Sequence, residues 1–178
     1  MKTLLSEEEL ERGVRKLADS INDVYQDSPL TIIAIMTGSI VLLADLIRLL
    51  TMPLRVGVVQ TSSYQGAQRG ELKINADLMP DIKDREVLLV DDIFDTGHTL
   101  GQVIELMRQM RPASLRSAVL LRKTGRQLID LVPDFVVFDI PDEFVVGYGL
   151  DYRDEYRNLP FLAALQEDDI RDVGSVVR

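Results

Sequence analysis

Five apolar runs alternate with segments of helical periodicity along most of the chain. The runs cover residues 30–36, 54–60, 86–91, 115–121 and 135–140, and aliphatic or aromatic side chains dominate them. Apolar runs of this length are typical of strands that are buried on both faces of a sheet. A shorter apolar segment at residues 144–146 predicts one further strand.

Three segments between or before these runs predict helices. Ser6 is followed three residues later by Glu9, a capping-box pattern that predicts a helix continuing to about Asp27. Residues 40–50 predict a second helix, and residues 97–110 predict a third with apolar positions on one side. Strands that alternate with helices indicate a mostly parallel α/β sheet, in which ligands bind beyond the carboxyl ends of the strands.

Two polar segments interrupt this alternation. Residues 61–77 carry two glycines, and they predict a long mobile loop or hairpin that serves as a lid, with Ser63 and Tyr64 near its start. Residues 166–178 form a polar tail without a readable motif. Since there is no internal repeat and no clear boundary, we expect a single domain over residues 1–178.

Composition narrows the chemistry. The absence of cysteine excludes disulfides and thiolate sites, and the single histidine, His98, excludes clustered-histidine metal sites. A divalent ion would bind carboxylate, water and substrate oxygens, as Mg²⁺ does. The net charge of -9 argues against nucleic acid as the main partner. With neither a signal-peptide pattern nor an apolar run of membrane-spanning length, we expect a soluble cytoplasmic protein.

Residues 87–99 carry the strongest chemical signal, Val-Leu-Leu-Val-Asp-Asp-Ile-Phe-Asp-Thr-Gly-His-Thr. A strand, a short loop and a helix in this order point several backbone N–H groups into one small volume at the positive end of the helix. Gly97 lets the backbone approach a phosphate closely, and the hydroxyls of Thr96 and Thr99 add donors. The segment therefore predicts a cradle for a phosphate monoester.

The acids just upstream, Asp91 and Asp92, suit ribose hydroxyls or a magnesium ion that carries them. Neither a Walker A loop nor a Rossmann glycine pattern is present. The arrangement of apolar strand, two acids, two apolar residues and Asp-Thr-Gly-x-Thr resembles the phosphoribosyl pyrophosphate signature of the type I phosphoribosyltransferases. That resemblance implies the family's fold, a central mostly parallel sheet flanked by helices, with a small hood and a mobile loop.

The downstream chain resembles one branch of that family. Residues 141–152, Pro-Asp-Glu-Phe-Val-Val-Gly-Tyr-Gly-Leu-Asp-Tyr, are similar to the base-binding segment of hypoxanthine-guanine phosphoribosyltransferases, and Arg157 follows Asp151 by six residues. Lys123 falls at the spacing of that family's purine-binding lysine. Two more segments match the family's pyrophosphate loop and the start of its mobile loop, namely Thr37-Gly38-Ser39 and Ser63-Tyr64.

The resemblance implies a purine-salvage enzyme that transfers the phosphoribosyl group of phosphoribosyl pyrophosphate to hypoxanthine or guanine. The resemblance implies that Asp91 and Asp92 contact the ribose and that Asp95 handles the purine ring-nitrogen proton. The 5′-phosphate is implied to bind the backbone of Thr96, Gly97, His98 and Thr99. Pyrophosphate is implied to bind Arg157 and the backbone of Thr37 and Gly38. The implied purine contacts are Lys123 at the six-position oxygen, Phe144 on the ring, Val145 at its edge and Asp151 beside it. Mg²⁺ is the implied cofactor, bound by Asp151 and, through water or ribose, by Asp91 and Asp92.

Thr37 departs from the family pattern, and His98 occupies a position that varies within it. Thr37 stands where a lysine is frequent, so we expect function to survive with weaker pyrophosphate affinity. A non-proline cis peptide between Met36 and Thr37 is also implied by the resemblance. His98 occupies the variable position of the signature, where only its backbone N–H is needed, although a lone histidine also suggests an acid-base catalyst.

Plainer interpretations exist for the downstream candidates. Without the resemblance, Lys123 fits a solvated lysine after a strand, and Phe144 fits a core side chain. Asp151 fits a turn residue, and Arg157 fits a surface ion-pair partner. Tyr64 is equally compatible with packing the base of its loop.

Two alternative functions stay open at this point. One is a non-catalytic regulator on the same fold that senses phosphoribosyl pyrophosphate or a nucleotide. The other is a phosphoribosyltransferase that prefers xanthine. The resemblance also implies a homodimer or homotetramer, and the sequence does not rank hypoxanthine against guanine.

Overall fold

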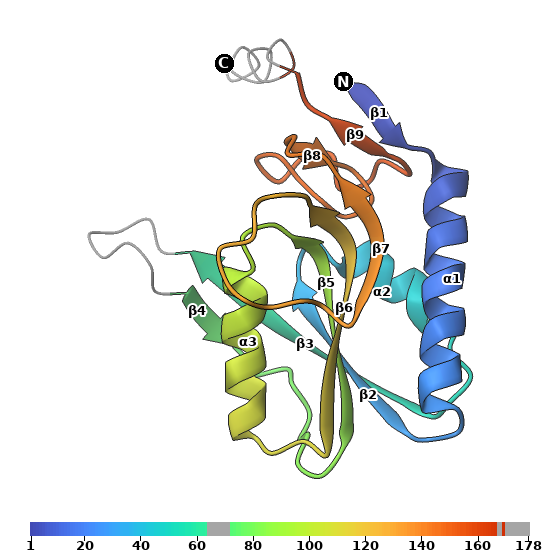
Figure 1. The fold of residues 1–178 in the computed structure, drawn as a ribbon, viewed down its shortest axis with the longest axis vertical. Coiled ribbons are helices and arrows are strands. Elements are labelled where there is room, and N and C mark those ends of the chain that lie inside the picture. Colours follow the sequence, from blue (N-terminus) through green and yellow to red (C-terminus); the bar gives the residue numbers. More distant parts are fainter. Residues whose placement is uncertain (64–71, 167–168, 170–178) are drawn as a thin grey trace.

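A six-stranded sheet forms the centre of the computed structural model, which describes residues 1–63, 72–166 and 169. The strand order is β4-β3-β2-β5-β6-β7 (Figure 1). These strands are β2 (Leu30–Met36), β3 (Leu54–Ser63), β4 (Leu72–Asn75), β5 (Glu86–Phe94), β6 (Ser114–Lys123) and β7 (Phe135–Ile140). All neighbours are parallel except β3 and β4, which confirms the mostly parallel α/β sheet.

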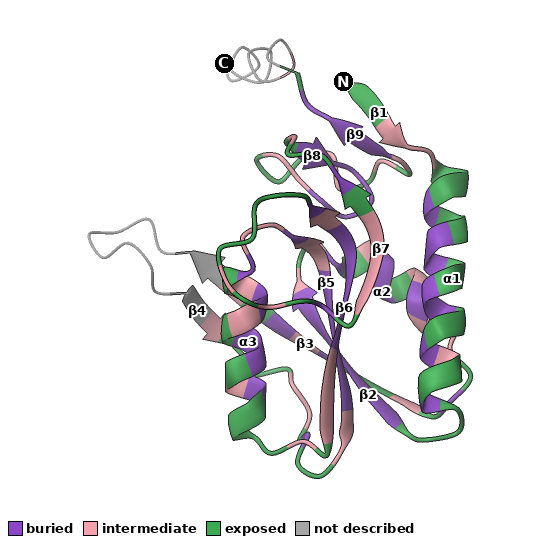
Figure 2. Cartoon of the chain, in the orientation of Figure 1, coloured by how far each residue is buried: buried purple, intermediate pink, exposed green. Residues whose placement is uncertain are grey.

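Helices cover both faces of this sheet. They are α1 (Glu7–Tyr25), α2 (Ile40–Ile47) and α3 (His98–Gln109). Successive strand residues point to opposite faces, so Ile32 and Leu88 pack under α1 and α2, whereas Ile33 and Leu89 pack under α3. All four side chains are fully buried. Buried and exposed stretches alternate along α1 and α3, while β2 is almost entirely buried (Figure 2). The unbroken apolar runs of the sequence therefore reflect burial on both sides.

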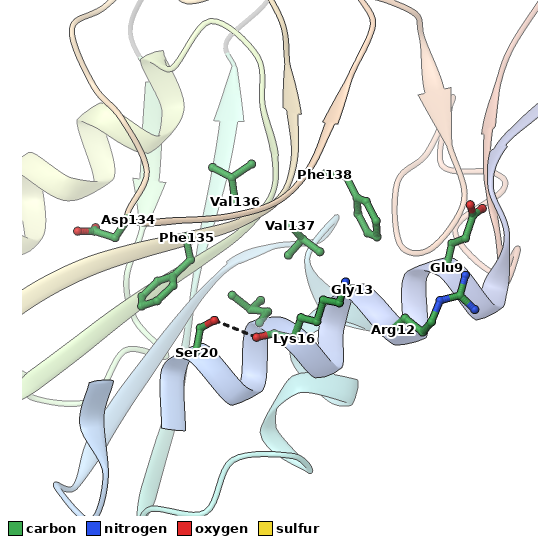
Figure 3. Close-up of a pocket in the computed structure, with 11 residues that line it drawn as sticks. Glu9, Arg12, Gly13, Lys16, Ser20, Asp134, Phe135, Val136, Val137 and Phe138 are labelled. Atoms are coloured by element: carbon green, nitrogen blue, oxygen red, sulfur yellow. Dashed lines mark hydrogen bonds between the residues drawn. The ribbon is translucent and has the colours of Figure 1, made fainter. Parts of the chain in front are cut away.

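The first helix starts at the predicted capping box. The Ser6 hydroxyl accepts from the Glu9 amide at 3.2 Å, and the Glu9 carboxylate accepts from the Ser6 amide at 2.8 Å. Further along α1, Gly13 lies so close to Phe138 of β7 that a Cβ at this position would overlap the ring (Figure 3). A hollow of about 530 Å³ lies between α1 and β7, and none of the predicted site residues lines it.

A second, three-stranded antiparallel sheet has the order β1-β9-β8. It consists of β1 (Lys2–Leu5), β9 (Leu162–Ala164) and β8 (Val145–Val146). The sequence predicts only the last of these strands, because β1 and β9 are short and pair across nearly the whole chain, with Lys2 opposite Ala164. The Met1 ammonium group also forms an ion pair with Asp169 at 2.8 Å.

Several element ends differ from expectation. The second helix stops at Ile47 because Asn22 of α1 binds the backbone of Leu49 and Thr51, each at 3.1 Å, and draws the chain out of the helix. β5 continues to Phe94 because its last residues still pair with β6. It therefore contains the two acids that were expected at its end.

The expected lid segment is partly a hairpin. β3 runs to Ser63, and β4 pairs with it in antiparallel fashion, so the hairpin alternative is confirmed for the described part of residues 61–77. Tyr64 and the side chain of Ser63 lie outside what the structure describes, as does most of the tail at 166–178. No helix in the described part of the chain is long and apolar enough to span a membrane.

Candidate active site

The predicted pyrophosphate, ribose and metal residues meet around one cavity at the carboxyl ends of β2 and β5. The cavity has a volume of about 250 Å³. It is lined by seven of the predicted residues, Thr37, Gly38, Asp91, Asp92, Thr99, Asp151 and Arg157, together with Ile35, Met36, Thr61 and Ile93. These residues come from four separate segments of the chain, as expected for a ligand site at the strand ends of an open α/β sheet.

The two adjacent acids form the floor of this site. Asp91 is buried, and its Oδ1 accepts from the Asp92 amide at 3.0 Å, while Asp92 Oδ1 accepts from the Ile93 amide at 2.9 Å. Burial and the neighbouring Asp92 carboxylate raise the pKa of Asp91 well above its usual range. Burial also raises the pKa of Asp92, although hydrogen bonds and the charge of Arg157 act in the opposite direction. The pair is electrostatically strained unless a cation or a hydrogen-bond donor joins it.

Two glycines let the segments of the site approach one another. A Cβ at Gly38 would overlap the Asp92 carboxylate, so Gly38 gives that carboxylate its room. Gly149 has φ +100°, and a Cβ there would overlap the Gly38 carbonyl oxygen. The expected non-proline cis peptide between Met36 and Thr37 is present in this loop.

Arg157 is held firmly beside that loop. Its Nη1 donates to the Gly149 carbonyl at 2.9 Å, and its Nη2 pairs with Asp151 at 2.9 Å and with Asp154 at 3.3 Å. The Gly149 amide donates in turn to the Arg157 carbonyl at 3.0 Å. This reciprocal binding aims a guanidinium group at the cavity, where it suits a phosphate or pyrophosphate group.

The phosphate signature forms the start of α3, as predicted. Gly97 is the residue before the helix and has φ +90°, and the first turn carries no acidic side chain. Thr96 and Thr99 are partly exposed, and the His98 side chain is exposed. Backbone N–H groups at such a helix start are free to bind an anion.

Lys123 and Asp95 lie together on the neighbouring side of the site. The Lys123 side chain is 11% exposed and lies between two carboxylates, with Nζ at 3.6 Å from Asp95 and 3.4 Å from Asp142. Arg126 joins the same two carboxylates, with Nε at 3.0 Å from Asp95 and Nη1 at 3.3 Å from Asp142. Sequence reasoning assigned no role to Arg126 or Asp142, because charged loop residues have no periodicity that shows where they meet.

The remaining purine candidates lie in and next to β8. Phe144 is 50% exposed and contacts Tyr152 edge to face, with ring centroids 5.5 Å apart. It is therefore not a core side chain, and a ring face is available to a planar ligand. Val145 is buried in β8. Neither residue lines the 250 Å³ cavity, whereas Asp151, the third purine candidate of this segment, does.

Metal ligation by protein groups alone is not a feature of this site. Within residues 1–63, 72–166 and 169, no three side chains of the usual ligand types gather closely enough to hold a metal ion. Asp91, Asp92 and Asp151 nevertheless face the same cavity. A magnesium ion there would have to complete its shell with water and substrate oxygens, which is its common mode of binding.

Comparisons with known proteins agree with this geometry. Residues 1–153 match the family model of the phosphoribosyl transferase domain. A hypoxanthine-guanine phosphoribosyltransferase from Staphylococcus epidermidis is 40% identical over 167 residues, 93% of each chain.

Two solved structures are also similar. One is a hypoxanthine-guanine phosphoribosyltransferase from Bacillus anthracis, with a TM-score of 0.88 and 38% identity over 93% of this chain and 99% of that one. The other is the hypoxanthine phosphoribosyltransferase of Trypanosoma cruzi in complex with the product IMP, with a TM-score of 0.87 and 35% identity over 94% and 95% of the two chains. The chain therefore belongs to the phosphoribosyltransferase family, among the hypoxanthine-guanine phosphoribosyltransferases.

Proposed function

We propose that the protein transfers the phosphoribosyl group of phosphoribosyl pyrophosphate to hypoxanthine or guanine, giving IMP or GMP and pyrophosphate. One observation carries this proposal: an acid pair, the Thr37-Gly38 loop, an arginine and the first turn of α3 line one cavity, and the buried Lys123 lies against Asp95, which follows the acid pair in the chain. A sugar phosphate needs the groups that line the cavity, and a purine base needs the lysine.

The sugar-phosphate contacts follow from residue chemistry. Asp91 and Asp92 accept hydrogen bonds from the ribose hydroxyls, and the backbone of residues 96–99 binds the 5′-phosphate at the start of α3. Arg157 and the Thr37-Gly38 backbone bind pyrophosphate. The fixed guanidinium group of Arg157 offsets the negative charge of the leaving oxygens.

Magnesium fits the acid side of this cavity. Among the described residues no lysine or arginine forms an ion pair with Asp91 or Asp92, although burial makes their charges costly. A divalent cation would offset that cost, and Asp151 faces the same space. Asp91, Asp92 and Asp151 would hold the ion through ribose, water or pyrophosphate oxygens. The ion supplies neutralisation of the charge on the leaving pyrophosphate.

The base contacts decide which substrate reacts. Protonated Lys123 is a donor without an acceptor site, so it matches the six-position oxygen of hypoxanthine or guanine and opposes the amino group of adenine. An unpaired buried polar group costs about 1–3 kcal/mol, which sets the scale of this discrimination. The exposed face of Phe144 stacks on the ring, Val145 contacts its edge through the backbone, and Asp151 lies beside it.

Transfer breaks the bond between ribose C1′ and the pyrophosphate oxygen and forms the bond between C1′ and a purine nitrogen. The ribose acquires oxocarbenium character as in glycoside chemistry, and the base loses its ring-nitrogen proton. Asp95 faces the five-membered ring and takes part in that proton transfer. Its carboxylate lies next to Lys123, which keeps the acid-base group and the six-position donor on one side of the base.

A spectrophotometric assay tests the function. Purified protein with Mg²⁺ and phosphoribosyl pyrophosphate is given hypoxanthine, guanine, xanthine, adenine or uracil separately. We expect nucleotide from hypoxanthine and guanine, none from adenine or uracil, and loss of all turnover when the metal is chelated. Preferred use of xanthine would favour the xanthine enzyme. No product from any base, with phosphoribosyl pyrophosphate still bound, would favour the non-catalytic regulator.

We also propose that the protein acts in the cytoplasm as a homodimer or homotetramer. The role of the C-terminal region in the oligomeric state has been studied for the T. cruzi enzyme, whose structure has a TM-score of 0.91 with this chain. Light scattering during gel filtration measures the mass directly. A monomeric mass at the protein concentration used in the activity assay would contradict the proposed assembly.

A further inference from the structure

Arg126 and Asp142 complete a closed ring of four charged groups at the purine side of the site. Asp142 Oδ1 lies 3.4 Å from Lys123 Nζ, and Asp142 Oδ2 lies 3.3 Å from Arg126 Nη1. Asp95 closes the ring, with Oδ2 at 3.6 Å from Lys123 and Oδ1 at 3.0 Å from Arg126. Each carboxylate therefore offers one oxygen to each cation.

The two carboxylates are not equivalent in the reaction. Under the proposed function, Asp95 must turn a carboxylate oxygen towards the purine ring nitrogen, so it cannot keep both cations. Lys123 is nearly buried, and a buried ammonium group requires an anionic partner. Asp142 is the second carboxylate within ion-pair distance of Lys123, and it comes from the loop between β7 and β8, whereas Asp95 precedes α3.

We propose that Asp142 is a positioning residue that holds the Lys123 ammonium group at the purine six-position while Asp95 serves the ring nitrogen. This inference rests on the proposed function, and it adds a determinant of the preference for six-oxo purines. Asp142 retains Lys123 on one oxygen and Arg126 on the other, so neither cation competes with the base for Asp95.

The expected size of the effect follows from exposure. The Asp142 side chain is 47% exposed, so solvent weakens its electrostatic interaction with Lys123, although Lys123 itself is largely buried. A loss of about fivefold in affinity for a six-oxo ligand is therefore expected when the charge is removed, the upper range for a partly exposed ion pair.

Two variants and a matched control test the proposal. Asp142→Asn keeps the shape and removes the charge, and Asp142→Ala removes the side chain. Asp139→Asn is the control, because it also removes a half-exposed carboxylate from an ion pair. Asp139 of β7 is 50% exposed and pairs with Arg122 of β6 at 2.5 Å, and neither residue belongs to the site. Calorimetry measures binding of IMP and of purine ribonucleoside 5′-monophosphate, which lacks the six-position oxygen.

We expect both Asp142 variants to bind IMP about fivefold more weakly, to bind the purine ribonucleotide as wild type does, and to raise the KM of hypoxanthine while kcat stays within about twofold. The control should match wild type throughout. Equal weakening of both nucleotides, or no change in either variant, would overturn the role of Asp142. Failure of the wild-type protein to bind or produce IMP would instead overturn the proposed function.

Discussion

Substitution of Gly38 by alanine tests whether the Asp92 carboxylate binds the ribose. The backbone at Gly38 is not left-handed, so alanine is compatible with its conformation. Its Cβ would, however, overlap Asp92 Oδ2, and the carboxylate would have to rotate away from the position in which it accepts from the Ile93 amide at 2.9 Å. The change therefore moves a functional oxygen without deleting it.

The Gly38→Ala substitution should affect both the stability of the protein and its binding of ribose. Crowding of this kind costs about 1–3 kcal/mol of stability, and the partial exposure of Asp92 lets its side chain rotate, which favours the lower end. A charge-assisted hydrogen bond contributes about 1.5–3 kcal/mol. Its loss at the ribose should lower kcat/KM for phosphoribosyl pyrophosphate about 10- to 100-fold.

Steady-state kinetics with varied phosphoribosyl pyrophosphate measure this loss, and thermal unfolding measures stability in the same preparation. Gly13→Ala is the matched control, because its Cβ overlaps the Phe138 ring in the contact between α1 and β7, away from the cavity. The control should lose stability and keep kcat/KM. A folded Gly38→Ala protein with wild-type kcat/KM would refute the assignment of Asp92 to the ribose.

Three further changes have distinct expected outcomes. Asp95→Asn should leave binding of phosphoribosyl pyrophosphate nearly intact and lower turnover by about 10²–10⁴, and an unchanged single-turnover rate would remove Asp95 from the mechanism. The pKa of Asp91 is raised in the folded protein, so wild-type stability should fall as the pH rises above about 4, where the carboxyl ionises in the unfolded chain but stays protonated in the fold, and the fall should end above the raised folded pKa. Asp91→Asn should flatten that decline and raise the apo Tm at pH 8 by a few degrees while impairing activity, whereas parallel pH–Tm curves would contradict the cause given for the shift. Tyr148→Phe removes a donor that binds Asp45 at 2.6 Å in a partly buried setting, so urea unfolding should show a loss of about 1–3 kcal/mol, and equal midpoints would show that the bond is not stabilising.

The sheet and the phosphate side of the site were predictable because their signals are local. The apolar runs form β2, β3, β5, β6 and β7, and α3 starts at His98, one residue after the expected Gly97. The segment around Asp91 and Asp92 combines strand, acids and helix start within thirteen residues, so its chemistry follows from order alone. The base segment was identified by resemblance to a family, and its residue roles stay predictions.

The parts that were not predicted depend on contacts between distant segments. Nothing near β1 or β9 indicates that they pair, because their partners lie at the other end of the chain. Arg126 and Asp142 stand in polar loops, where a charge is usually solvated, and only the folded chain brings them to Lys123. The end of α2 likewise depends on Asn22 from another helix.

The pairing of β1 with β9 also constrains how the protein is made. During synthesis the first strand leaves the ribosome long before its partner exists, so it has no sheet to join until about 160 further residues have been added. The neighbouring β8, which carries Val145 of the base segment, pairs with the same late partner. Contacts of such large sequence separation form slowly. The central sheet and its phosphate cradle can thus be assembled on a nascent chain, whereas the sheet that carries Val145 is completed only after residues 162–164 have been synthesised.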